Sequence, residues 1–490
     1  MLAERLLRPL NALLLFATAA VSSASSLPNG GLQVPTGGPG GTFDWVVPSN
    51  AVVFLDTAGT TLIGGPAGAP TTTQLVEDGI VQVRDWIVEE GALVRVSGPF
   101  PLQVYATGEI RIEGTVDLSG FDAKDVNTLN TANIPEPGAI GGPGGGRGGA
   151  SSTVTNGPTP SGSPGTAAFG QGSGGLGGES QFSPPTTQPA VDQRRPGGGG
   201  GGRFARDRDV HAAEDGFDGH PLGFGALTGT SPARGGPAGP SAFLDGVAGN
   251  DFWGARILAP SGTSGSLNVV RGELPCLWAG SGGGGGGDAL GGNAFPAPNW
   301  TIGTDEKGGP GGGGGGGAHF VSLQEIRFGD AGTIRADGGM GATGENTFFL
   351  DHIGGSGGSG SGGHVVLSAP RIDFSDGGTG SGARTFLSAV GGPRVTGPPT
   401  TGGNVSFGGA GGRGVIQLHV PDPLLPPSTL PTAQIVLPAG VSALSELSDP
   451  TPFVLLPLFD AFGTAPDALP SARPRSGRRA HRSTAGSASR

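Results

Sequence analysis

The densest cluster of ionisable side chains in the sequence lies between residues 207 and 220. Oxygen-rich loops of this kind bind calcium, which takes about six to eight oxygen ligands. Four carboxylates fall at the ligand spacing of a calcium loop of about 12 residues, namely Asp207, Asp209, Asp215 and Asp218. His211 stands where that loop needs an oxygen, and Ala212 where it needs a glycine. We therefore keep two interpretations, a calcium site and a solvated acidic loop.

The other reactive residue types do not show the spacing of a known metal, nucleophile or phosphate-binding site. The seven histidines show no zinc-site spacing, although His319 and His364 each follow a glycine run, which indicates a repeated unit. The sequence predicts no nucleophile elbow, and no P-loop lysine follows a glycine run. The five tryptophans are dispersed, which favours loop packing over a sugar-stacking platform. We predict no catalytic and no cofactor-binding residue.

The amino terminus has the layout of a secretory signal peptide over residues 1–24. Arg5 and Arg8 precede an apolar stretch from Leu10 to Val21, and a small-residue cleavage site follows, ending at Ala24. No later run reaches the 18 or so apolar residues of a membrane-spanning helix. We expect an exported protein, either extracellular or at the cell surface. Its one cysteine, Cys276, has apolar neighbours, and we expect it to be buried.

Charge limits the possible partners. Only 14% of residues are charged and the formal net charge is −11. Nucleic acid is excluded as a partner of the body of the protein, because phosphate binding needs a cationic surface. For an exported chain we expect envelope components such as cell-surface polysaccharide instead.

Short stretches rich in β-branched residues, separated by single glycines, indicate strands. The sequence predicts strands at 80–88, 93–96, 102–105, 110–112, 115–118, 325–328, 332–336, 365–367, 371–374, 386–389 and 415–418. Residues 108–116 and 324–334 share the pattern Glu-apolar-Arg-apolar, glycine turn, Thr-apolar. Repeats of this kind favour an all-β parallel β-helix-like solenoid, with a β-sandwich as the alternative.

Glycine dominates the composition, with 103 residues, and forms long tracts at 141–149, 197–202, 282–287 and 311–317. One interpretation is flexible loops, since glycine has the most backbone freedom to lose. The other is extended polyproline-II-like segments lying side by side, where missing side chains allow close approach. A collagen triple helix is excluded, because glycine does not recur at every third position.

These patterns divide the chain into five parts. A Gly/Pro/Thr-rich segment at 25–75 follows the signal peptide, and the solenoid spans 76–424, with most insertions at 121–320. The chain then continues with a Pro-rich segment at 425–470, and we expect its last part, 471–490, to be a basic, disordered tail.

The run from Gly108 to Gly120, followed by glycine tracts and a closing Gly412-to-Leu418 segment, resembles uncharacterised glycine-rich exported bacterial proteins. More distantly it is similar to β-helical surface proteins and adhesins. The resemblance implies a non-enzymatic structural or surface-associated protein, with adhesion as an expected role. The alternatives are an extracellular polysaccharide-acting β-helix enzyme and a calcium-stabilised carbohydrate-binding module. In the enzyme, carboxylates such as Asp117, Asp337 and Asp373 would converge in one groove.

Overall fold

The computed structural model describes residues 43–65, 71–126, 135–151, 162–170, 172–179, 198–204, 213–218, 234, 236–239, 255–258, 268–271, 277–290, 305–345, 354–375, 385–395, 407–422, 425–448 and 453–457. The predicted signal peptide, Cys276 and the basic tail lie outside these residues.

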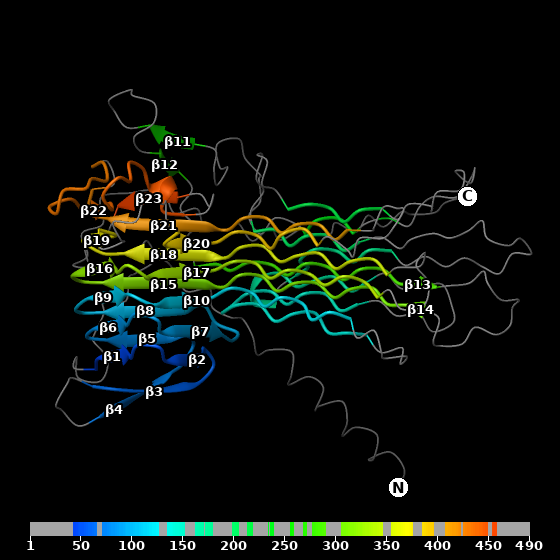
Figure 1. The fold of residues 1–490 in the computed structure, drawn as a ribbon, viewed down its shortest axis with the longest axis horizontal. Helices are drawn as coiled ribbons and strands as arrows, with labels where there is room; N and C mark the ends of the chain where they lie inside the picture. The colour runs from blue at the N-terminus through cyan, green and yellow to red at the C-terminus, as the bar shows by residue number, and fades with distance from the viewer. Residues whose placement is uncertain are drawn as a thin grey trace, which may run out of the picture.

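Three parallel sheets form the body of the described chain (Figure 1). Sheet I contains β1 (Trp45–Val47), β6 (Trp86–Val88), β9 (Ile110–Ile112), β16 (Glu325–Phe328), β19 (Arg371–Asp373) and β22 (Ile435–Val436). Sheet II contains β2 (Val52–Asp56), β7 (Leu93–Ser97), β10 (Thr115–Asp117), β17 (Thr333–Arg335) and β20 (Leu387–Ser388). Sheet III contains β5 (Ile80–Val83), β8 (Leu102–Ala106), β15 (Gly317–Ser322), β18 (His364–Ser368), β21 (Val415–Val420) and β23 (Phe453–Pro457).

The chain visits sheets I, II and III in turn, and each circuit forms one rung of a parallel β-solenoid. The predicted fold class is confirmed, and the internal repeat proves to be two stacked rungs. Ile110 pairs with Ile326 between β9 and β16, and Thr115 pairs with Thr333 between β10 and β17. The first rung begins at β1, within the segment that the sequence assigns to 25–75, and β22 and β23 extend the sheets beyond residue 424.

One predicted strand is wrong in its extent. Residues 80–88 form two strands, β5 and β6, because the chain turns a corner at Arg84 and Asp85. An Asp85 carboxylate oxygen accepts the backbone N–H of Glu109 at 3.0 Å, and Arg84 is ion-paired with Asp44 and Asp85. Side-chain hydrogen bonds build this corner, so no glycine marks it.

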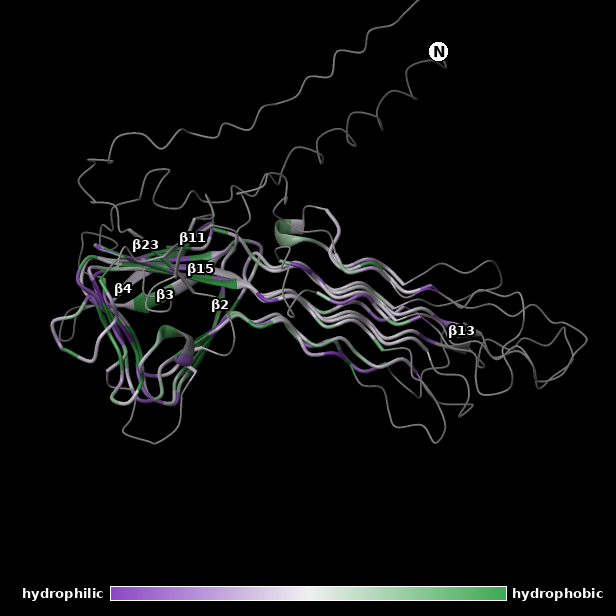
Figure 2. Ribbon diagram, turned by 90° about the horizontal axis from the view of Figure 1, so that it is seen from above, coloured by the Kyte–Doolittle hydropathy of each residue, from purple (hydrophilic) through white to green (hydrophobic). Residues whose placement is uncertain are grey.

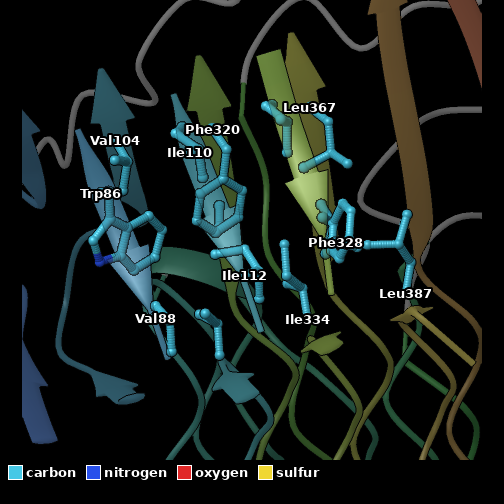
Figure 3. Close-up of a cluster of buried hydrophobic side chains, with 14 of the residues drawn as sticks. Trp86, Val88, Val104, Ile110, Ile112, Phe320, Phe328, Ile334, Leu367 and Leu387 are labelled. Carbon is cyan, nitrogen blue, oxygen red and sulfur yellow. The ribbon is translucent and has the colours of Figure 1, made fainter. Parts of the chain in front are cut away.

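Side chains that alternate along the strands fill the centre of the solenoid (Figure 3). Aromatic rings stack from rung to rung, with centroids 5.3 Å apart for Trp45 and Trp86 and 5.5 Å apart for Trp86 and Phe320. Full burial of one such side chain contributes about 1.5–3 kcal/mol. The stacked apolar columns therefore hold the rungs in register.

A hairpin closes the amino-terminal end of the solenoid. Its strands, β3 (Thr60–Gly64) and β4 (Thr72–Val76), pair antiparallel and bury Leu62 and Val76 against the core. The Gln74 amide, oriented to pair with both groups, bonds the backbone N–H and C=O of Gln82 on the edge strand β5. The hairpin thus covers the open core and blocks part of an unpaired sheet edge.

Three successive rungs send the chain out of the solenoid at one corner, between sheets II and III. The excursions cover 118–316, 336–363 and 389–414, and each returns to the next strand of sheet III. Most of their described residues form a bundle of extended segments that projects from one side of the solenoid (Figures 1 and 2). The antiparallel pairs β11 (Ala255–Leu258) with β12 (Asn268–Arg271) and β13 (Ala289–Leu290) with β14 (Asp305–Glu306) belong to the longest excursion.

Backbone hydrogen bonds between neighbouring segments hold the bundle together. The N–H groups of Gly309, Gly312 and Gly315 donate to the carbonyls of Gly355, Gly358 and Ser361 at 2.8–2.9 Å. The interval of three residues is that of a polyproline-II helix, which makes no internal hydrogen bonds. These segments satisfy their backbone groups on neighbours instead. The ordered interpretation of the glycine tracts is therefore confirmed for the described segments.

Segments inside the bundle are surrounded on every side. Residues 279–288 bond to six neighbours among the described residues, at 146–149, 163–166, 175–178, 200, 309–315 and 355–361. The segments 198–202, 307–317 and 354–363 are enclosed in the same way. These four segments contain the long runs of glycine, or of glycine and serine, because a backbone neighbour occupies each direction in which a side chain would point.

Candidate functional site

The predicted calcium ligands lie only partly within the described residues. Asp207 and Asp209 are outside them, whereas Asp215 and Asp218 lie in the segment 213–218 at the surface of the bundle. Asp215 accepts the backbone N–H of Ala238 at 2.6 Å, an interaction that fixes two neighbouring segments. No three metal-binding side chains come together within the described parts of the chain. The calcium site therefore stays a prediction.

A row of side chains, polar except for Phe54 at one end, crosses the outer face of sheet II where that sheet meets the bundle. The register aligns Phe54, Arg95, Asp117, Arg335 and Ser388 on successive strands. Arg95 is ion-paired with Asp117 and donates to the carbonyl of Ser119 at 2.8 Å. Its guanidinium also lies 4.0 Å from the centre of the Phe121 ring, a cation–π contact. Phe121 belongs to the bundle, so this arginine ties the solenoid to the root of the bundle.

Asp337 lies beside this row, just beyond the end of β17. Burial raises the pKa of Asp337, and the charge of Asp117 acts in the same direction, whereas hydrogen bonds from Ser388 and Val390 oppose both. The Val390 N–H lies 2.9 Å from the carboxylate. Asp337 therefore fixes the chain where the third excursion begins.

The three carboxylates of the enzyme hypothesis do not converge. Asp117 and Asp337 lie close together at sheet II, but Asp373 is on β19 of sheet I, ion-paired with Arg371. A site that cleaves a polysaccharide needs its catalytic acid and base to flank the same glycosidic bond. This arrangement counts against the enzyme alternative.

The outer face of sheet III carries a buried polar network that the sequence did not reveal. His319 Nε2 lies 2.8 Å from the hydroxyl of Ser368, and the Tyr105 ring packs edge-on against His319. His364 accepts the backbone N–H of Trp278 at Nδ1 and bonds the side-chain oxygen of Gln417 through Nε2. Because Nδ1 accepts, Nε2 must carry the proton, so His364 is a neutral imidazole.

Burial sets the protonation behaviour of this network. It lowers the pKa of His364 to about 3. It also lowers the pKa of His319 well below its usual value, with His419 and His364 acting in the same direction. Burial raises the pKa of Tyr105 to about 12. A neutral, hydrogen-bonded network of this kind stabilises packing and offers no exposed group to a substrate.

The two histidines that follow glycine runs are not equivalent in the structure. His364 pairs with Gly317, and His319 pairs with Val366, so they stand two residues out of register. Of the tryptophans, Trp45 and Trp86 are core residues and Trp278 packs edge-on against Phe169. Trp253 and Trp300 lie outside the described residues.

Several side chains on the surface of the bundle stand at the third position of Gly-Gly-X repeats. Met340, Leu176 and Arg147 each follow two glycines, and Met340 and Leu176 are 40% and 37% exposed. Three residues per turn place every third side chain on the same face. This repeat was the sequence signal for the outer segments of the bundle. Comparisons with protein families, curated proteins and solved structures found no match to this chain.

Proposed function

We propose that this chain is an exported, non-enzymatic structural protein of the cell surface that serves in adhesion. In this proposal the solenoid is a rigid base and the bundle is a projecting arm that presents side chains on its surface. One observation carries the proposal. Three successive rungs leave at the same corner and build a single arm, whose interior segments are mainly glycine and are joined by backbone hydrogen bonds.

The construction suits a mechanical role. Each interior segment is cross-linked to its neighbours by repeated hydrogen bonds of 2.7–3.1 Å, and each such bond has a net value of about 0.5–1.5 kcal/mol. Glycine loses more conformational freedom than other residues when it is ordered. Many cooperating bonds offset that cost, so the arm forms as a unit.

Fractionation of cells that encode the protein, with a tagged full chain, tests export. We expect the mature chain in the surface or extracellular fraction; recovery in the cytoplasm would overturn the proposal. A gene deletion tests adhesion. Attachment should fall in the deletion strain and return with the wild-type gene.

A matched pair of variants connects adhesion to the arm. Gly284→Val places a side chain inside the bundle, whereas Leu430→Ser changes a side chain that is 63% exposed on the segment preceding β22. Complementation with Leu430→Ser should restore attachment and complementation with Gly284→Val should not. Equal attachment in the deletion strain and the wild type would refute the adhesive role.

A further inference from the structure

The amino-terminal end of the solenoid has an apolar outer surface. The hairpin β3–β4 turns Leu62 and Val76 toward the core and exposes Thr61, Ile63, Thr73 and Leu75 on its other face. Ile63 is 67% exposed and Leu75 is 51% exposed. The end of a repeat protein needs a polar outer face to stay soluble as a monomer. This outer face carries two large apolar residues, two threonines and no charged residue.

Around the hairpin the same end exposes more apolar side chains. Val46 on β1 and Val52 and Phe54 on β2 are 43%, 58% and 73% exposed. Both strands belong to the first rung, beside the hairpin (Figure 1). They stand on the outer faces of sheets I and II, so they border the hairpin face and do not belong to it. Apolar side chains exposed at the end of a repeat protein, where a polar cap is needed, mark an interaction surface.

We infer that this end binds the same end of a second copy of the chain, about a two-fold axis. The positions of the large side chains indicate that the partner is a second copy. Ile63 stands opposite Thr73 and Leu75 opposite Thr61, so the large residues occupy one diagonal of the face and the small residues the other. A two-fold axis in the plane of contact, along or across the strands, sets each large side chain over a small one of the partner. Sheet faces pack by such interdigitation.

Charge agrees with this partner. Because the hairpin face is uncharged, two copies meet without burying an unpaired charge. Asp56, Glu77 and Asp78 lie exposed near its margin, and each copy has a net charge of −11. Repulsion between the copies then opposes an apolar attraction. The dimer should therefore tighten as salt screens the repulsion.

The size of the patch sets the strength of the dimer. Each copy contributes one two-stranded hairpin face, so the contact is smaller than the roughly 1,200–2,000 Å² of specific, stable interfaces. We therefore expect a reversible dimer whose population depends on protein concentration. Sedimentation equilibrium of the full chain, from low to high micromolar concentration and at low and high sodium chloride, measures it.

Two substitutions that introduce charge on the hairpin face test where the interface lies. Ile63→Asp with Leu75→Asp should weaken the dimer at least about tenfold, which corresponds to about 1.4 kcal/mol. Leu425→Asp with Leu430→Asp, at positions 52% and 63% exposed in the segment before β22, is the matched control and should leave it unchanged. The melting temperature of each variant checks that it folds.

Three results would overturn the inference. A monomer at every concentration and salt level excludes the second copy. A dimer that survives Ile63→Asp with Leu75→Asp lies elsewhere on the molecule. Dimerisation that appears only after deletion of residues 25–42 shows that the segment before Phe43 covers this end in the full chain.

Discussion

At the scale of the residue, the glycines inside the bundle leave no room for a side chain. A Cβ atom at Gly284 would lie 2.0 Å from the carbonyl oxygen of Leu176, which is backbone and cannot turn away. Overpacking of this kind costs about 1–3 kcal/mol, so Gly284→Ala should lower the free energy of unfolding by about that amount in urea titrations. Gly59→Ala is the control, because no atom lies within 4 Å of its Cβ position. Equal stability of the two variants would contradict close packing of the bundle.

At the scale of the element, the outer face of sheet III makes the fold sensitive to acid. The pKa of His364 is about 3 in the folded chain, against an ordinary value of 6.5, so the unfolded chain binds the proton first. Its stabilising contribution is complete above pH 6.5 and is lost as the pH falls toward 3, by about 1.4 kcal/mol per pH unit. His319 acts in the same sense. Urea titrations between pH 7 and 5 should show this slope, and His364→Gln should reduce it; an unchanged slope would exclude His364 as its source.

At the scale of the whole molecule, base and arm should resist opening together. Interior amides of the arm, such as those of 279–288, are bonded on all sides, although the segment belongs to no sheet or helix. Hydrogen–deuterium exchange should therefore be as slow there as in the core strands β8 and β15, and faster in surface segments such as 389–395. Exchange at the rate of an unfolded chain in 279–288 would show that the arm is not a packed unit.

The sequence predicts the solenoid well, because the strands and turns of each rung are visible locally as alternating β-branched residues and single glycines. Gly91, for example, has a φ of +75°, a conformation that glycine adopts without strain. The corner at Asp85 was missed because a side chain, not a glycine, forms it. The enclosure of residues 279–288 could not be predicted, since its six neighbours come from distant parts of the chain and no hydrophobic period marks a backbone contact. The polar row at Arg95 and the network at His364 could not be predicted either, because their residues come from different rungs and meet only in the stacked structure.

The glycine-rich interior of the arm has a consequence for how the gene can change. All four glycine codons share their first two bases, so a change at either base replaces the residue and only the third position is silent. In the interior segments a replacement meets a neighbouring main chain, as at Gly283, where a Cβ would lie 2.1 Å from the Gly358 carbonyl oxygen. Mutational drift is therefore directed to the X positions of Gly-Gly-X. The side chains that the arm displays can diversify while its framework stays constant.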